Sequence, residues 1–416
     1  MNMRRAGAVL LLVGLALLGC RVRSAATRRV RRDPGHSYLT DQHALNLGQR
    51  WGEIQPFTTM KANLSEVTSI KSSFFFRSFD PDGVVFYGDT KAGLDWFVLA
   101  LRGGVPEMQI GKGDARVSVS GGPRLDDGLW HQVQVSSVGQ FVVLEVDGAA
   151  VLNVGLYSPN MDPELQGQIR LALGGILVNS SLLFSPLRPE MDGCLQGGNW
   201  LNLSAAWESH LDAPPKLCFQ HLSRGSYFPG TGLALLQSTD FPLDAADRRI
   251  TVEVSVHTER HRGTLFAVLN RQNETLITAT LQEDTEVLKL TVCGRDTFLP
   301  FPSLGEASLA VSVWEHGMQL QTGTSAPMLQ PGDLADWLDT WESGVLLAVG
   351  GVPDSSCYNG SQDQDYFQGC LLKFSIQGKA VDLDRAWYKH DSVSSHSCPG
   401  KEPESELSNL VATGAM

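Results

Sequence analysis

Residues 72–90 read SSFFFRSFDPDGVVFYGDT, and this stretch decides the fold class of the 416-residue chain. Two runs of aromatic and β-branched residues flank the turn sequence Asp80-Pro81-Asp82-Gly83. Similar runs follow at 95–110 (DWFVLALRGGVPEMQI), 116–119 (RVSV), 121–135 (GGPRLDDGLWHQVQV) and 141–148 (FVVLEVDG). Apolar runs interrupted roughly every eight to twelve residues by Gly, Pro and Asp are typical of consecutive antiparallel strands. We therefore predict an all-β sandwich.

The first 26 residues have the three zones of a secretory signal peptide: Arg4 and Arg5, an apolar run over 8–18, and small residues at Ala25 and Ala26. The apolar run is too short to span a bilayer, and no later segment approaches that length, so we predict a secreted, extracellular protein without membrane insertion.

Both flanks of the folded region have polar compositions. Residues 27–50 are turn-rich and are expected to be flexible. Within them 29–32 (RVRR) is either a dibasic processing site or part of a disordered basic leader. The tail 400–416 is acidic and rich in small residues, which predicts disorder.

A repeat divides the chain into two modules, 51–222 and 226–399. Gly174-Gly175 precedes Gly193-Cys194 and Gly350-Gly351 precedes Gly369-Cys370, with 19 residues from the second glycine to the cysteine in both. The next cysteines follow 24 and 28 residues later. Repeated turn glycines and a repeated cysteine loop predict two copies of one fold, each with a disulfide at its C-terminal end, Cys194–Cys218 and Cys370–Cys398.

The remaining cysteines of the mature chain, Cys293 and Cys357, lack counterparts in the first module, and they can pair with each other if their Cα atoms lie within about 7 Å. Acceptor sequences for N-glycosylation fit the same oxidising compartment. They stand at Asn63, Asn179, Asn202, Asn273 and Asn359.

Composition and motifs argue against two classes of function. A formal charge of −12, with no basic face beyond the leader, argues against nucleic acid as a partner. The chain has no G-x-S-x-G, HExxH, Cys-x-x-C or glycine-rich phosphate loop, so we predict that it is not an enzyme. His131 and the Asp126-Asp127-Gly128 turn have ordinary structural explanations. The many aromatic residues of the first module suit either a sandwich core or an apolar binding cavity.

The chain resembles the sex hormone-binding globulin (androgen-binding protein) family. The resemblance rests on FRSFDPDGVVFYGDT, DWFVLALR, GGPRLDDGLWHQVQV, VVLEVDG, IRLALGGI and MDGCL, followed by a second Gly-Cys module. It implies two tandem laminin G-like, jelly-roll β-sandwiches, a secreted carrier that binds androgens and oestrogens in the first one, a structural calcium ion and a homodimer. A laminin G-like adhesion or receptor-ligand protein, with a cell-surface partner and no steroid transport, is the alternative.

The resemblance assigns steroid-contacting roles to residues of the first module. Ser72 matches the serine that binds the ring A end of the steroid, and Asp95 matches the aspartate that binds the 17β-hydroxyl. Thr90, Phe97 and Ile169 are further expected contacts.

Lys112 departs from the family, which has an asparagine there. A charged lysine only donates hydrogen bonds, so Lys112 suits a 17-keto or hydroxyl oxygen and can pair with Asp95 inside the site. The other interpretation places Lys112 at the mouth of the site, with its stem over the ligand and its ammonium in water.

The resemblance also predicts the metal sites and the assembly. Asp80 and Asp82 match positions that hold calcium, although Asp-Pro-Asp-Gly is also an ordinary turn sequence. The family's zinc-binding histidines are replaced here by Gly113 and Gln166, so no zinc site is predicted. Residues 159–167 match a mobile lid. The predicted edge strands at 116–120 and 151–154 are expected to pair in the dimer.

Overall fold

A computed structural model describes most of the folded region of the chain. The described residues are 44–69, 71–138, 141–155, 167–211, 215–243, 248–282, 286–302, 305–315, 317–323, 328–329, 335–353 and 366–400. The signal peptide, the processing motif and the acidic tail lie outside them, and so do Cys357, Asn359 and Gln166.

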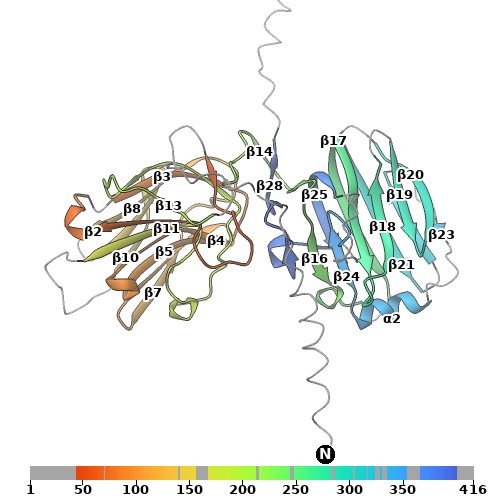
Figure 1. Cartoon of the computed structure of the whole chain (residues 1–416), viewed down its shortest axis with the longest axis horizontal. Coiled ribbons are helices and arrows are strands. Elements are labelled where there is room, and N and C mark those ends of the chain that lie inside the picture. The colour runs from red at the N-terminus through yellow and green to blue at the C-terminus, as the bar shows by residue number, and fades with distance from the viewer. Residues whose placement is uncertain are drawn as a thin grey trace, which may run out of the picture. The chain divides into compact units, whose positions relative to one another are not determined.

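Two antiparallel sheets form the first sandwich (Figure 1). The first sheet has the order β1 (Leu45–Asn46), β12 (Gly193–Trp200), β3 (Lys71–Ser78), β8 (His131–Val138), β9 (Phe141–Val146) and β10 (Ala149–Gly155). The second has the order β13 (Glu208–Ser209), β2 (Thr58–Asn63), β11 (Gln168–Leu173), β4 (Gly83–Thr90), β5 (Asp95–Arg102), β6 (Val105–Lys112) and β7 (Ala115–Ser120). The predicted all-β fold is confirmed.

The core of this sandwich follows from the alternation of its strands. In β3, Ser72, Phe74 and Phe76 are buried, and they belong to the face that packs on the second sheet. Strand β4 is apolar on both faces because a second cluster covers its outer side. That cluster includes Val84, Tyr87, Trp96, Val98 and Ile176.

Residues 27–50 were expected to be flexible, and this expectation is wrong for the residues from Leu45 to Leu47. Leu45 and Leu47 are buried, and β1 pairs with β12 through Leu45↔Leu195 and Asn46↔Cys194. The Nδ2 of Asn46 also donates to the Asp192 carboxylate at 2.9 Å. These two leucines, isolated among polar neighbours, are covered by tertiary packing that local composition does not reveal.

The long strand β17 (Ile250–Leu269) connects the two sheets of the second sandwich. Its first part pairs with β21 (Glu306–Trp314) and β25 (Gln368–Ile376), and its last part pairs with β18 (Thr275–Leu281) and β24 (Leu346–Val349). The remaining strands are β15 (Ser226–Pro229), β16 (Ala234–Gln237), β19 (Val287–Val292), β20 (Arg295–Pro300), β22 (Gly317–Thr322), β23 (Met328–Leu329), β26 (Lys379–Ala380) and β27 (Tyr388–Lys389). A short pair, β14 (Leu222–Arg224) and β28 (Ser397–Pro399), forms separately.

Helix α2 (Ala335–Ser343) lies at one end of the strands of the second sandwich (Figure 1). Its Trp337, Leu338 and Trp341 are buried in the core of that sandwich. The Trp341 Nε1 donates to the Phe241 carbonyl at 2.9 Å, so the polar group of this buried ring has a hydrogen-bond acceptor. In the described part of the chain, no helix is both long and apolar enough to cross a membrane.

Both repeated disulfides are confirmed, each with its Cα atoms 5.9 Å apart: Cys194–Cys218 and Cys370–Cys398. Cys293 is exposed in the β19–β20 turn and forms no disulfide within the described residues; its pairing with Cys357 stays a prediction. The four described acceptor asparagines, Asn63, Asn179, Asn202 and Asn273, are all exposed.

Candidate ligand-binding site

Four of the predicted contact residues form one row across the second sheet of the first sandwich. Strand register pairs Ile169 with Thr90, Thr90 with Asp95, and Asp95 with Lys112. The row lies at the strand ends: the start of β11, the end of β4, the start of β5 and the end of β6. Because side chains at paired positions share a face, these four side chains are neighbours on the same face of the sheet.

The next row on this face contains Phe97 opposite Gly88, with Leu171 and Ile110 on either side. A Cβ on Gly88 would lie 2.5 Å from the Phe97 ring and 3.1 Å from Leu171. Gly88 therefore gives the Phe97 ring the space that it occupies above β4.

Ser72 comes from the other sheet, where it pairs with Val135 of β8 and Trp200 of β12. The residue is only 2% exposed, and its hydroxyl has no hydrogen-bond partner among the described residues. A buried hydroxyl without a partner is uncommon, because desolvation of the group is then uncompensated. A polar group of a bound ligand can supply that partner.

An aromatic cluster lies beside Ser72. The ring of Trp200 stacks on Phe74 at 5.4 Å and contacts Phe86 at 5.2 Å and Trp207 at 5.1 Å between centroids. Phe86 also meets Phe97 edge-on at 5.3 Å. The aromatic cluster connects the first sheet, which carries Ser72, with Phe97 on the second.

The core of the first sandwich is incompletely buried at the end where this row lies. Phe97, Ile110, Val117 and Ile169 pack against the core cluster but remain partly exposed. Further along three of these strands, Leu99, Met108 and Leu171 are buried. Partly exposed apolar walls with a few polar groups are the composition of a site for an apolar ligand.

Asp95 has a neighbour that the sequence analysis missed. Its carboxylate lies 3.3 Å from the Nζ of Lys91, and both side chains are partly exposed. Lys91 and Ala92 have positive φ angles of 51° and 55°, in the short turn Lys91–Gly93 that joins β4 to β5. The four-residue spacing of Lys91 and Asp95 was the available signal, although it becomes informative only with this turn geometry.

Lys112 is half-buried, and within the described residues Asp95 has no ion pair with it. Whether Lys112 contacts a ligand or lies at the mouth of the site stays a prediction. The lid segment lies outside the described residues except for Gly167, and Gly113 lies in the β6–β7 turn.

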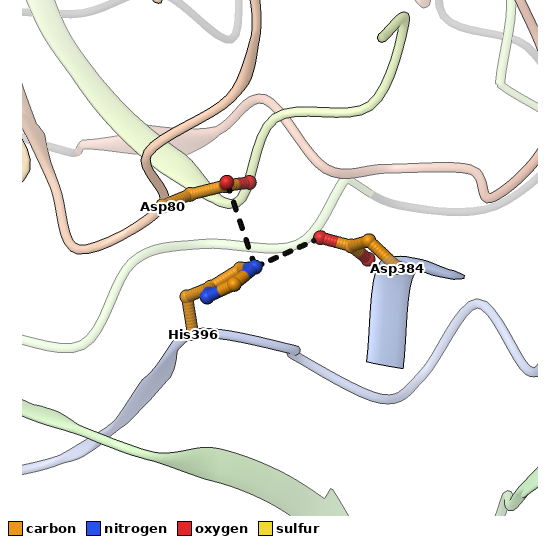
Figure 2. A group of neighbouring side chains, drawn as sticks. All are labelled: Asp80, Asp384 and His396. Atoms are coloured by element: carbon orange, nitrogen blue, oxygen red, sulfur yellow. Dashed lines mark hydrogen bonds and ion pairs between the residues drawn. The ribbon is translucent and has the colours of Figure 1, made fainter. Parts of the chain in front are cut away.

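The predicted calcium residue Asp80 lies in a different set of neighbours from the one expected. Asp80 is completely buried, and its carboxylate accepts the backbone N–H of Asp82 at 3.0 Å and of Asp192 at 2.8 Å. Figure 2 shows it beside His396 and Asp384, which are distant in sequence. The Asp82 carboxylate instead accepts the Gly103 N–H at 2.9 Å.

The ring of His396 is the centre of an ion-pair network. Its Nε2 lies 3.1 Å from Asp384, 3.5 Å from Asp80 and 3.5 Å from Asp382. Lys389 and Arg188 contribute further positive charge, at 2.8 Å from Asp384 and 2.9 Å from Asp382.

The electrostatics of this network favour a charged imidazole. Burial raises the pKa of Asp80 to about 7. Burial alone would lower the pKa of His396, but Asp80, Asp382 and Asp384 together raise it well above its ordinary value. The acidic turn therefore already has positively charged neighbours.

Comparisons with known proteins agree with this architecture. Residues 76–205 match the Laminin G domain family. The chain is 33% identical over 372 residues to sex hormone-binding globulin of Crocuta crocuta, covering 88% of this chain and 91% of that protein. It is 32% identical to the human protein of the same name, covering 86% and 87%. Mouse growth arrest-specific protein 6 is 30% identical, over 55% of its own length.

Solved structures give the same fold. Domains LG4-5 of the mouse laminin alpha1 chain align with a TM-score of 0.62 and 17% identity, covering 92% of this chain and all of that one. The LG1-3 region of the laminin alpha2 chain aligns with a TM-score of 0.52 and 14% identity, covering 86% and 66%. At these identities the structures establish the laminin G-like fold alone. The sequence relatives, matched over most of their length, go further: the chain belongs to the sex hormone-binding globulin family.

Proposed function

We propose that the first sandwich binds sex steroids, androgens and oestrogens, reversibly and that the protein carries them in extracellular fluid as a secreted, non-catalytic carrier. The observation that carries the proposal is the buried, unpartnered hydroxyl of Ser72 at the end of the sandwich where Asp95 and partly exposed apolar side chains gather. The names of the family relatives support the ligand class.

The physical properties of a steroid suit this site. A steroid is a rigid apolar skeleton with an oxygen at each end, so apolar walls supply most of the binding free energy. Ser72 and Asp95 come from opposite sheets, and each provides one polar contact that fixes the direction of the ligand. Rigidity also limits the conformational entropy that binding removes.

Equilibrium binding of tritiated testosterone to the full secreted protein tests the proposal. We expect saturable uptake, and Ser72→Ala should weaken it about five- to tenfold through loss of one hydrogen bond. The matched control is Ser73→Ala, one residue along the same strand and on its other face. Absence of saturable uptake by the wild-type protein would contradict the proposal and favour the adhesion alternative.

A structural calcium ion at the Asp80–Asp82 turn is part of the same proposal. Asp80 and Asp82 would supply carboxylate oxygens, and Asp384 offers a third within 4.8 Å of the Asp80 oxygen. The ion would replace the His396 ring, whose Nε2 lies 3.5 Å from Asp80 and 3.1 Å from Asp384. Such oxygens are the ligands that calcium prefers. Thermal unfolding in CaCl2 and in EDTA tests it: calcium should raise the Tm by a few degrees, and Asp82→Asn should reduce that gain. Equal Tm values in the two buffers would contradict the proposed calcium site.

A homodimer through the first sandwich completes the proposal. The two segments expected to pair, 116–120 and 151–154, belong to β7 and β10, which are the terminal strands of their sheets. A lysine on an edge strand opposes edge-to-edge pairing. Sedimentation velocity should therefore show a dimer for the wild type and a larger monomer fraction for Asn153→Lys, whose side chain is exposed. A monomeric wild type would refute the dimer.

A further inference from the structure

Trp207 carries a second buried polar atom without a partner, in the same region as Ser72. The indole Nε1 of Trp207 is inaccessible to solvent and has no hydrogen-bond acceptor among the described residues. The residue stands between β12 and β13, in the segment 201–207 that passes from the first sheet to the second. Along this segment Leu201, Leu203, Ala205 and Trp207 pack against the core of the first sandwich.

The two unpartnered atoms border the same aromatic cluster. Ser72 is the strand partner of Trp200, and the Trp200 ring meets the Trp207 ring edge-on, with an interplanar angle of 79°. Phe74 and Phe86 complete the contacts of Trp200. Trp207 is therefore separated from Ser72 by one side chain of the proposed binding wall.

An indole N–H donates a hydrogen bond and accepts none. A buried donor of this kind usually has an acceptor. Without one, the folded chain loses the hydrogen bond that water makes with the donor in the unfolded chain. No described residue supplies this acceptor, and an oxygen of a ligand that enters the core beside Trp200 can supply it.

We infer that the Trp207 N–H is an additional polar contact to the ligand and donates to the oxygen at the ring A end that Ser72 also binds. This inference rests on the proposed steroid-binding function. A ketone oxygen accepts two hydrogen bonds, one from the hydroxyl of Ser72 and one from the indole. A phenol oxygen is a weaker acceptor because its lone pair is delocalised into the ring, so Trp207 favours 3-keto steroids over phenolic ones.

Two ligands that differ only in this oxygen provide the test: 5α-dihydrotestosterone, and 5α-androstan-17β-ol, which lacks the 3-oxygen. In the full-length protein, Trp207→Phe removes the N–H and keeps a ring against Trp200. We expect the affinity for dihydrotestosterone to fall about five- to tenfold and the affinity for the 3-deoxy steroid to change less than about twofold. The double variant Ser72→Ala/Trp207→Phe should lose less than the sum of the single losses, because both groups bind one atom.

The matched control is Trp337→Phe in the second sandwich, where an indole N–H is also buried without a partner among the described residues, and it should leave both affinities unchanged. Equal losses for the two steroids would mean that Trp207 acts by packing alone and would overturn the inference. Unchanged affinities for both would overturn it too. A wild-type protein that binds neither steroid would instead refute the proposed function on which the inference rests.

Discussion

The two sandwiches share a fold but differ at one end of the core. In the second, the chain between β23 and β24 contains helix α2, and Trp337, Leu338 and Trp341 fill the core. The corresponding segment of the first lies between β10 and β11, since β11 and β24 both lead into a Gly-Gly turn. There, Phe97 and Ile169 stay partly exposed. The second copy fills this end of its core with its own helix, whereas the described apolar side chains at this end of the first core stay partly exposed.

The position of Ser72 strengthens this comparison. Leu195 and Leu371 follow the repeated cysteines, and they pair with Phe76 in β3 and with Val256 in β17. Counting back four residues along each strand, Ser72 corresponds to Val252, which is buried in the second core. The fold therefore accommodates an apolar side chain at this position, so it does not require the Ser72 hydroxyl, which is buried without a partner among the described residues.

Removing one large side chain of helix α2, which packs in the second core, should have the largest effect on stability. Trp341→Ala removes a ring that is 1% exposed and also a hydrogen bond, so we expect a loss of about 3–5 kcal/mol in the free energy of unfolding. Ile169→Ala, at the open end of the first core, should cost only about 1 kcal/mol because less area is buried. Urea unfolding of the whole protein measures both, and equal losses would contradict the contrast between the ends.

A methyl group at Gly88 should damage binding more than stability. Its Cβ would displace the Phe97 ring, which borders the proposed site, and we expect steroid affinity to fall about tenfold. Gly111→Ala is the matched control, since its Cβ would press on Trp96 in the cluster on the outer face of the same sheet. If both variants lost affinity equally, the effect would come from general distortion of the sheet.

Lys112 should influence ligand preference rather than overall affinity. Lys112→Asn replaces a pure donor with a group that also accepts, so the 17β-hydroxyl of testosterone gains a possible acceptor while the 17-ketone of androstenedione does not. We expect the ratio of the testosterone affinity to the androstenedione affinity to rise about threefold in competition assays. An unchanged ratio would show that Lys112 makes no ligand contact.

Much of the fold was predictable because its signals are local. The alternation of residues along SSFFF predicts which side chains of β3 are buried. The repeated spacing of Gly and Cys predicts the two disulfides. The proposed contact residues Thr90, Asp95 and Lys112 were predicted by resemblance, and strand register explains why they are neighbours.

The remaining features depend on contacts that local sequence does not encode. Asp80 meets Asp384 and His396 across some 300 residues, a proximity that tertiary packing alone creates. The ion pair of Asp95 with Lys91 requires left-handed backbone at two non-glycine residues. The unpartnered state of Trp207 depends on all of its neighbours together. Helix α2 did leave a signal, two tryptophans four residues apart, but strand patterns on both sides obscured it.

The smallest expected effect concerns a pH-dependent contact that, among the described residues, the first sandwich has and the second lacks. His131 Nδ1 lies 2.8 Å from Asp147 and its Nε2 lies 3.2 Å from Asp127. Burial opposes the charge, but hydrogen bonds to Asp147 and Asp127 raise the pKa of His131 overall. In the second sandwich the strand register replaces His131 and Asp147 with Ala307 and Gly323.

Because the folded-state pKa of His131 is raised, its contribution to stability is complete below the unfolded value of about 6.5 and is lost as the pH rises through the folded value. The groups are partly exposed, so this contribution should be at most about 1 kcal/mol. Free energies of unfolding at pH 6 and pH 8.5 should therefore differ more in the wild type than in His131→Gln. An identical pH dependence in the two proteins would show that the contact is electrostatically neutral.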